Sequence, residues 1–579
     1  MIVTMKLLKI LSLCAAGLFL TTSCDLEEET FTFVAGEDVA AEGSYDQLVA
    51  GAYHTLHWPF TWGNYHNVVN FDCDYQTGPS WAFGDEGAGN FYDKSSTKNF
   101  YQYYCTTIHR ANYHYYLVQK ITGVTEKEKN NALGELRFLK AWSQFQLVQF
   151  FGPIPLYTYS IAEGNSTELP RSSVKEVYEH IIETLKEAEA LLLPRTDEAF
   201  KKGHVCRATA KALLAKVYAT IGSASMKSGQ VTVKGGPGSK VNPDGTTSRL
   251  MPVAITHSKN VVAGYEEFDS QEYYRLAKEK AGEVINSGEV SLASSQKELW
   301  SPAYKNGPEL LFCLQTMAGQ GDDYYNYVSK DYYGWPDPAY NGEWTSGYYV
   351  QRDHWLQTFD DWDDERITWG VKHRVPYNWN KTYEKMEWYF YPERDSVKVR
   401  QGLPPYEGCP YKYETTDVVR NGAHEYGAKL EKFTAITADN NGNRTDWNWP
   451  YLRYADLILI YCEAENELNG PTTDAFAKME MLNKRNNSTL VSKRHEKNPF
   501  TKESFRSFVL EERAKEFAAE GIRRYDLLRW GIYLQVMNAI GTVDENEIVK
   551  RREEKHLLLP FPPDVVNTNP YIDRNNPGW

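Results

Sequence analysis

Helical segments that occur in consecutive pairs are the feature of this sequence that most constrains its fold. Apolar residues recur every three or four positions over about 130–150, and Gly152 and Pro153 end the pattern. Ser173 is the expected N-cap of a second segment, whose apolar stripe continues to Pro194. Segments with the same periodicity follow at 204–222, 272–288, 453–470, 476–487 and 505–521. This periodicity predicts a mainly α-helical chain.

Small residues lie where the helices of the second pair are expected to cross. They are Ala208, Ala212 and Ala215 in the first helix and Ala277 and Ala281 in the second. Such residues let two helices approach closely. In this respect the pairs resemble tetratricopeptide repeats, in which antiparallel helices stack into a curved body. The expected fold class is therefore mainly α, a tetratricopeptide-like helix-pair scaffold with irregular, loop-rich insertions.

Two stretches interrupt the helical pattern. Residues 229–249 are predicted to form a long exposed loop because they are rich in Gly and Pro. The alternative, a phosphate-binding loop, is disfavoured because the G-x-x-x-x-G-K-[ST] spacing is missing. Residues 289–445 show no long helical pattern, so loops, short strands and short helices are expected there. We expect a helical scaffold over about 45–290 and 446–579 and an aromatic, loop-rich ligand-side region over about 291–445.

The first 23 residues have the features of a bacterial lipoprotein signal peptide. A short positively charged region precedes the apolar residues 10–20, which are too few to span a bilayer. Cys24 follows three small residues and resembles the acylated cysteine of a lipoprotein, although Thr21 stands where Leu is usual. Asp25, Glu27, Glu28 and Glu29 resemble the acidic stretch that follows this cysteine in surface-exposed lipoproteins of Bacteroidetes. We expect residues 24–579 to be anchored through Cys24, with an ordinary signal peptide cleaved elsewhere as the alternative.

Charge and motifs exclude several classes of function. The formal net charge of -14 argues against nucleic acid, because binding to phosphates requires an excess of basic side chains. The cysteines contain no C-x-x-C pair, so neither a zinc site nor a thioredoxin motif is predicted. The motifs G-x-S-x-G, H-E-x-x-H and G-x-G-x-x-G do not occur. We therefore predict no catalytic residue, no cofactor and no metal ligand.

A run of carboxylates, FDDWDDERI, allows three interpretations. Its members are Asp360, Asp361, Asp363, Asp364 and Glu365. They could be the paired carboxylates of a glycosidase or the ligands of a calcium ion. The favoured interpretation is that they cap a short helix and pair with Arg366 on a solvated surface.

The segment LEERAKEFAAEGIRRYDLLRWG carries the other dense group of charges. We predict that its charged side chains form bidentate ion pairs that fasten the last long helix and the turn after it. These side chains are Glu512, Arg513, Glu516, Glu520, Arg523, Arg524, Asp526 and Arg529.

Aromatic side chains are abundant, with 41 Tyr and 16 Trp, and they concentrate at 53–116 and 322–391. Sugar rings have flat C–H faces edged by hydroxyl groups, so a sugar site needs aromatic faces with polar groups at the rim. Two Gly- and Pro-containing loops offer this mixture, the first of them beside Asp72 and Asp74. The candidate ligand-binding residues are Trp81, Phe83, Asn90, Tyr332, Tyr333, Trp335 and Trp344. Trp142, by contrast, lies on a helical stripe and is assigned to the core.

Five segments together resemble the SusD/RagB family of Bacteroidetes outer-membrane lipoproteins. They are ELRFLKAWSQFQLVQFFGPIPL, ATAKALLAKVYATIG, YLRYADLILIYCEAENELNG, LEERAKEFAAEGIRRYDLLRWG and LLLPFPPDVVNTNPYIDRNNPGW. The resemblance implies a helical body whose repeats face a partner TonB-dependent transporter of the SusC type. It also implies a glycan site built by irregular segments on the opposite, outward side.

The expected function is that of a non-catalytic lipoprotein of the outer membrane, facing the cell exterior. It would capture oligosaccharides and deliver them to the transporter with an affinity in the micromolar to millimolar range, about -8 to -4 kcal/mol. Two alternatives remain at this point. One is a binder of peptides or another nutrient in the same kind of complex, and the other is an all-α secreted glycoside hydrolase.

Overall fold

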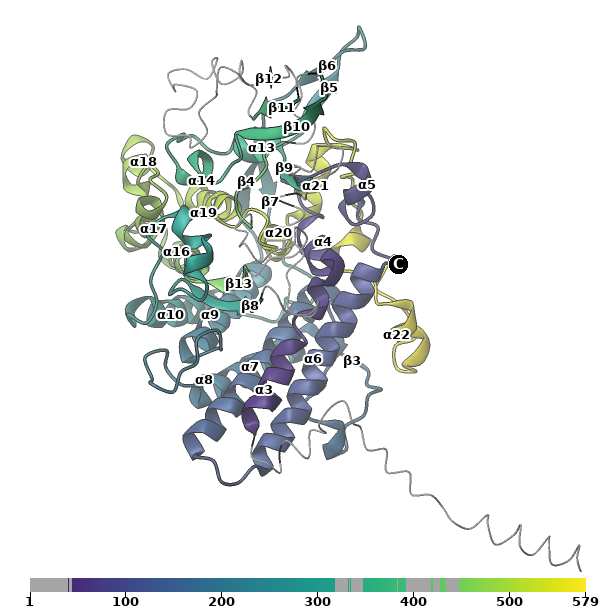
Figure 1. The fold of residues 1–579 in the computed structure, drawn as a ribbon, viewed down its shortest axis with the longest axis vertical. Helices are drawn as coiled ribbons and strands as arrows, with labels where there is room; N and C mark the ends of the chain where they lie inside the picture. Colours follow the sequence, from purple (N-terminus) through teal and green to yellow (C-terminus); the bar gives the residue numbers. More distant parts are fainter. Residues whose placement is uncertain are drawn as a thin grey trace, which may run out of the picture.

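The computed structural model describes residues 40, 44–317, 332, 334, 347–382, 384–391, 418–419, 427–433 and 447–579. It is mainly α, as predicted (Figure 1). The long helices of the N-terminal half gather at one end of the body, and short strands and helices lie at the other. Among the described residues, no helix is both long and apolar enough to cross a bilayer.

The first helices confirm the periodicity and one predicted cap. They are α3 (Tyr45–His54), α4 (Asn64–Asn70), α5 (Ser80–Phe83), α6 (Ser95–Lys120), α7 (Glu126–Phe151) and α8 (Val174–Leu191). Thr125 caps α7 by accepting a hydrogen bond from the Glu128 backbone N–H, and Gly152 with φ 69° ends it. Ser173 caps α8 in the same way, as expected.

Trp142 of α7 is 2% exposed and packs against Phe312 and Tyr451, with ring centroids 5.3 and 5.2 Å away. Its assignment to the core is therefore confirmed. The strands β2 (Ile154–Pro155) and β3 (Arg171–Ser172) pair beside the end of α7.

The second helix pair packs as closely as its alanines predict. Helix α9 (Arg207–Ser225) lies against α10 (Ser270–Asn286), and none of the five alanines at the crossing is more than 3% exposed. Gly222 of α9 contributes as well, because a Cβ there would lie 3.0 Å from the ring of Tyr274. Small residues on both helices thus allow the contact.

The insertion between α9 and α10 corrects one prediction. Instead of a long loop, β4 (Gln230–Gly235) pairs antiparallel with β7 (Val253–Ser258), and β5 (Ser239–Val241) pairs with β6 (Thr247–Arg249). Val231 and Val233 point into the core while their neighbours are more exposed, which is the alternation of a strand. The Gly- and Pro-rich residues obscured this short alternation because they also form the turns.

The C-terminal part returns to helices. They are α16 (Tyr454–Asn469), α17 (Thr473–Arg485), α18 (Val491–Lys497), α19 (Lys502–Glu516), α20 (Arg523–Arg529), α21 (Tyr533–Ile540) and α22 (Pro563–Thr568).

Only short elements occur in the described residues between α10 and α16. They are α11 (Gln296–Leu299), the 3-10 helix η4 (Pro302–Tyr304), β8 (Leu310–Leu314), β9 (Val350–Gln351), α13 (Asp353–Leu356), α14 (Glu365–Thr368), β10 (Arg374–Asn380), β11 (Lys385–Phe390), β12 (Val418–Val419) and β13 (Trp449–Arg453). Strand β8 pairs with β13, and β9 pairs with β1 (Gln76–Thr77), which brings residues distant in the chain together.

Ion pairs fasten α19 and α20 to the rest of the body, as predicted. Arg513 donates to Asp456 at 2.7 Å and to Asp526 at 2.8 Å, and all three side chains are almost fully buried. Arg529 makes a bidentate pair with Glu463, at 2.5 and 2.7 Å. Removing one partner of such a pair leaves an uncompensated buried charge, so these contacts specify how the helices dock.

The acidic run forms the predicted cap and ion pair; Asp360 and Asp363 are exposed as expected, but the capping residue and its arginine are buried. Asp364 caps α14 and pairs with Arg366 at 2.6 Å, and the two residues are 2% and 3% exposed. They can be buried because Glu512 of α19 also accepts from Arg366, at 2.6 Å. Asp361 accepts two hydrogen bonds of 2.6 Å from Thr489.

Candidate functional site

The structure separates the predicted ligand-binding residues into three groups. Trp81 is 71% exposed and Asn90 is also exposed. Phe83 and Tyr332 are 0% and 1% exposed, so neither ring can reach a ligand at the surface. Tyr333, Trp335 and Trp344 lie outside the described residues, as does the predicted lipidation site Cys24. Trp81 is therefore the described ring around which a site can be built.

The exposed Trp81 and the half-buried Tyr348 form a ring pair, which we call the aromatic platform. Their ring centroids are 4.7 Å apart and the planes make an angle of 62°. Tyr348 is not among the residues predicted from the sequence; it follows Gly347 in the second aromatic-rich region. In the edge-to-face arrangement that aromatic pairs favour, one ring supports the other. The high exposure of Trp81 leaves its indole as the surface offered to a ligand.

Buried rings lie directly beneath the platform. Tyr348 contacts Tyr349 at 4.8 Å between centroids, and Tyr349 stacks on His66 at 4.9 Å with an angle of 4°. Phe83, two residues after Trp81, stacks on Phe71 at 4.0 Å. The platform thus rests on packed rings, which limits the conformations that its side chains can adopt.

Tyr332 belongs to this support. Its hydroxyl lies 2.8 Å from Nε2 of His66 and accepts a hydrogen bond from Gln76 Nε2 at 2.9 Å. Burial lowers the pKa of His66 to about 3, so this imidazole is neutral at physiological pH. The predicted ligand residue Tyr332 therefore acts as a packing residue below the site.

Local geometry explains how one short helix presents Trp81 and buries Phe83. Helix α5 follows Gly78 and Pro79, where the chain turns tightly. A Cβ at Gly78 would lie 2.8 Å from the Phe83 ring and 3.0 Å from the Tyr348 carbonyl oxygen. Glycine is thus required for the chain to pass between Phe83 and the backbone of Tyr348, two residues before β9.

The carboxylates that the sequence places beside Trp81 are not rim groups. Asp72 is 0% and Asp74 is 3% exposed, and Asp74 forms a bidentate pair with Arg523 at 2.8 and 2.6 Å. Burial by itself would raise the pKa of Asp72, but Arg552 and Arg524 lower it to about 2. The sequence predicted ion pairs for Arg523 and Arg524, but nothing in it indicated that their partners are Asp74 and Asp72.

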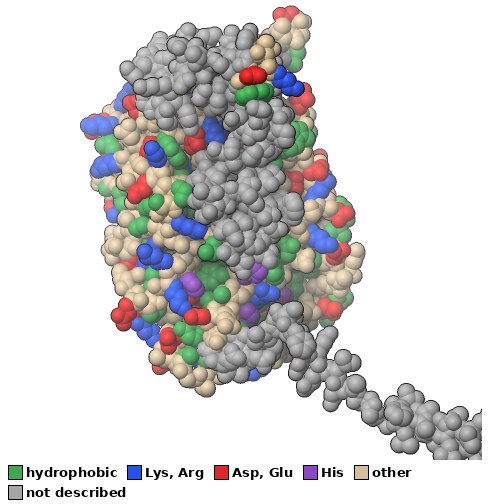
Figure 2. All heavy atoms as spheres, in the orientation of Figure 1, with side chains coloured by type: hydrophobic (Ala, Val, Ile, Leu, Met, Phe, Trp, Pro, Cys, Tyr) green, Lys and Arg blue, Asp and Glu red, His purple; other side chains and the backbone are tan. Residues whose placement is uncertain are grey.

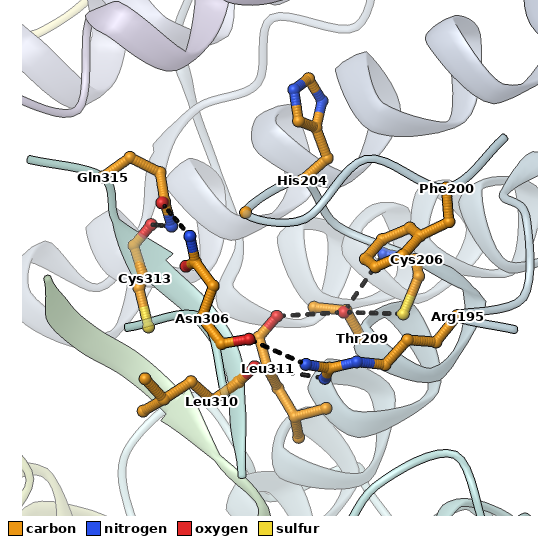
Figure 3. A pocket seen from close by; sticks show the side chains of 11 residues that line it. Arg195, Phe200, His204, Cys206, Thr209, Asn306, Leu310, Leu311, Cys313 and Gln315 are labelled. Atoms are coloured by element: carbon orange, nitrogen blue, oxygen red, sulfur yellow. Dashed lines mark hydrogen bonds between the residues drawn. The ribbon is translucent and has the colours of Figure 1, made fainter. Parts of the chain in front are cut away.

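Neither of two hollows formed by described residues is an enclosed sugar pocket. The cavity in Figure 3 has a volume of about 10 Å³, and Arg195 and Thr209 there donate to backbone carbonyl oxygens of 307–311. It has room for about one water molecule. A shallow hollow of about 400 Å³ is lined by the polar residues 483–484 and 487–489 with Asp361 and Asp363, without an aromatic ring. A flat exposed ring is found at the platform instead.

Charges do not define a further site in the described part of the chain. On the face shown in Figure 2, basic and acidic side chains are interspersed among the coloured atoms. In the segment that follows α5, Lys94 pairs with Asp85 at 2.7 Å. The described residues contain no group of three or more His, Cys, Asp or Glu side chains arranged to hold a metal ion.

Comparisons with known proteins agree on one family. A family model described as "SusD family" matches residues 308–579, and one described as "Starch-binding associating with outer membrane" matches residues 60–219. SusD-like protein P2 of Formosa agariphila is 24% identical over 78% of this chain and 75% of its own. SusD-like protein P38 of the same organism is 22% identical over 98% and 97% of the two chains.

Solved structures share the fold. A SusD homologue from Bacteroides thetaiotaomicron superposes with a TM-score of 0.70 at 20% identity, covering 93% of this chain and 97% of its own. Surface glycan-binding protein A from the same organism, solved in complex with laminarihexaose, gives a TM-score of 0.62 at 16% identity over 92% and 98%. The two matched parts contain the two halves of the platform, Trp81 in the first and Tyr348 in the second. Family models, relatives and fold thus agree, and the chain belongs to the SusD/RagB family.

Proposed function

We propose that the protein is a non-catalytic glycan-binding protein of the outer membrane that binds oligosaccharides on the aromatic platform. The observation that carries this proposal is the 71% exposure of Trp81 on a helix whose neighbouring ring, Phe83, is fully buried. An exposed indole beside a second ring, with polar side chains nearby, is the combination that a sugar site needs. The C–H face of a sugar would cover it.

The free energy expected from stacking one sugar ring on Trp81 is small enough for reversible binding of a glycan. Covering about 100 Å² of the indole at about 25 cal/mol/Å² contributes about 2.5 kcal/mol. A dissociation constant between micromolar and millimolar corresponds to about -8 to -4 kcal/mol, so polar contacts must supply the rest. The exposed Asn90 amide is one candidate for such a contact. Release to a transporter is compatible with an affinity in this range.

The location and the partner are also part of the proposal. One matched family model is described as associating with the outer membrane, and residues 1–24 resemble a lipoprotein signal that ends at an acylated cysteine. We infer that Cys24 anchors the chain to the outer membrane with its body outside the cell. The glycan would pass from the platform to a SusC-like TonB-dependent transporter.

The described carboxylates of the acidic run support a non-catalytic role. Asp364 is paired with Arg366, Asp361 accepts from Thr489, and Asp360 pairs with Arg494. A glycosidase needs two carboxyl groups that face each other across a cleft and reach the substrate. These three instead stabilise the fold.

Calorimetry with a panel of neutral oligosaccharides tests the proposal. The panel contains starch, laminarin and xyloglucan oligosaccharides and, for comparison, short peptides. Trp81→Ala is expected to weaken binding of the recognised glycan at least tenfold, since it removes the stacking surface. Tyr159→Ala is the matched control, because that ring is 47% exposed on the loop between β2 and β3.

Three outcomes would contradict the proposal. Equal affinity of wild type and Trp81→Ala would exclude the platform as the site. Binding of peptides in place of every glycan would favour uptake of another nutrient. New reducing ends formed from a polysaccharide by the purified protein would show hydrolysis.

A further inference from the structure

The chain on either side of Trp81 is attached to one buried carboxylate, Asp72. Arg524 Nε donates to its Oδ2 at 3.1 Å, and Arg552 Nε donates to its Oδ1 at 2.9 Å. The hydroxyl group of Tyr533 donates to Oδ2 at 2.5 Å. We call these four residues the Asp72 centre, and none of them is more than 3% exposed. Because charges taken out of water need directed partners, the centre favours one arrangement of its side chains.

Arg552 additionally contacts the turn that follows α5. Its Nη2 donates to the Gly87 carbonyl oxygen at 2.7 Å while its Nε remains on Asp72. Gly89, with φ 81°, lies against the same guanidinium group, and a Cβ there would be 3.0 Å from Arg552 Nε. One side chain therefore connects the residue before the platform loop with the turn after it.

The shortness of α5 makes this connection matter for Trp81. The helix has four residues, and Trp81 is the second of them. Its last residue, Phe83, is enclosed so tightly that a Cβ at Gly87 would lie 2.7 Å from its ring. A helix of one turn has little rigidity of its own. Its direction is therefore set by the points at which the flanking residues are attached.

We propose that Arg552 is a positioning residue of the aromatic platform: by joining Asp72 to Gly87 it sets the direction in which α5 presents the Trp81 indole to a glycan. The role in binding rests on the proposed function above. The role in placing Trp81 does not, because it concerns the protein without a ligand.

Arg524 supplies a matched comparison within the same centre. It donates to the same carboxylate, but its Nη2 donates to the His556 carbonyl oxygen at 2.9 Å and not to the turn after α5. Replacing either arginine by lysine keeps a cation near Asp72 and removes a second directed hydrogen bond. If both arginines only stabilise the fold, the two replacements should affect Trp81 and glycan binding equally. If Arg552 positions Trp81, its replacement should affect them more than the replacement of Arg524.

Fluorine NMR of the mature chain labelled with 5-fluorotryptophan measures the placement of Trp81 directly. The Trp81 resonance is identified among the 16 Trp by its loss in Trp81→Phe. Arg552→Lys is expected to shift or broaden this resonance and to weaken glycan binding about tenfold. Arg524→Lys is expected to leave the resonance in place and the affinity within twofold, at a comparable loss of Tm.

Gly89→Ala provides a second test of the proposal in case Arg552→Lys does not fold. It retains both arginines but places a Cβ against the guanidinium of Arg552, so the same displacement of the Trp81 resonance is expected. An unmoved resonance in both Arg552→Lys and Gly89→Ala would overturn the proposal, as would an equal displacement in Arg524→Lys. If wild type binds no glycan, the proposed function fails, while the resonances measured without ligand still decide the role of Arg552.

Discussion

Two buried charge centres of the protein are alike in chemistry and differ in what they support. In the Asp72 centre, one carboxylate accepts from two arginines, and one of these arginines continues to the loop that carries Trp81. In the Glu516 centre, Glu516 accepts from Arg366, Arg453 and Arg485, and Glu309 accepts from the last two. Glu516 is 0% exposed.

The elements attached to each centre explain the difference. The Glu516 centre joins α14, α17, β13 and α19, which all lie in the body of the protein. The Asp72 centre joins the C-terminal segment to the turn that follows the one-turn helix α5. The same kind of ion pair thus stabilises the fold in one place and, in our proposal, shapes a binding surface in the other.

The largest expected effect comes from breaking the Glu516 centre. Glu516→Gln leaves three buried arginines with reduced compensation, so the free energy of unfolding should fall by about 5 kcal/mol. In the part of the chain that the structure describes, the hydrogen bonds and ion pairs of this centre do not involve residues 80–89, so the glycan affinity of the folded fraction should stay unchanged. Urea unfolding measures the free energy of unfolding, and calorimetry at low temperature measures the glycan affinity. A tenfold loss of affinity would contradict the distinction between the two centres.

Removing the charge of Asp72 should have a smaller effect on stability and a larger one on binding. Asp72→Asn leaves Arg524 and Arg552 without a counter-charge, which is expected to lower the free energy of unfolding by about 3 kcal/mol. It should also weaken glycan binding about tenfold, since Arg552 is no longer fixed. Urea unfolding and calorimetry again measure stability and glycan affinity. Unchanged binding in this variant would mean that both centres only stabilise the fold.

Acid should weaken both centres with a defined sign. Burial by itself would raise the pKa of both carboxyl groups, but the arginines lower it, to about 2 for Asp72 and well below the usual range for Glu516. A carboxyl group with a lowered folded-state pKa stabilises the protein fully above its unfolded value near 4, and this contribution is lost as the pH falls toward the folded value.

For Asp72 the contribution lost between about pH 4 and pH 2 is about 2 kcal/mol. Urea unfolding at pH 5, 4, 3 and 2.5 measures this dependence, and Asp72→Asn is expected to reduce its slope. A variant with the same slope as wild type would remove Asp72 as a source of the acid sensitivity.

The smallest effect is expected far from both centres, at the N-terminus of α7. Thr125→Ala removes the side-chain oxygen that accepts from the Glu128 N–H, which should cost about 1 kcal/mol of stability. Thr106→Ala is the control, since this exposed hydroxyl donates to the Gln102 carbonyl oxygen within α6 and caps nothing. A larger loss in Thr106→Ala than in Thr125→Ala would contradict the cap, and neither variant should change glycan binding.

Local patterns predicted the elements whose interactions are local. The apolar periodicity near 130–150 belongs to α7, and Ser173 caps α8, because both signals act within one or two turns of helix. The sheet of β4 and β7 escaped prediction because its valines alternate over only a few residues among glycines and prolines. The pairing of Gln76 with Gln351 joins segments so distant in the chain that no local pattern could indicate it.

The sequence by itself determined that the chain is a helical body of the SusD/RagB family, that the charges of 510–531 pair, and that aromatic rings gather in two regions. Only the tertiary structure decided that Trp81 faces water while Phe83, two residues later, is buried, and that the DCD cluster lies inside the protein. The reason is physical: exposure and ion pairing depend on which distant segments pack against a residue, whereas helix formation depends mainly on its neighbours in the chain.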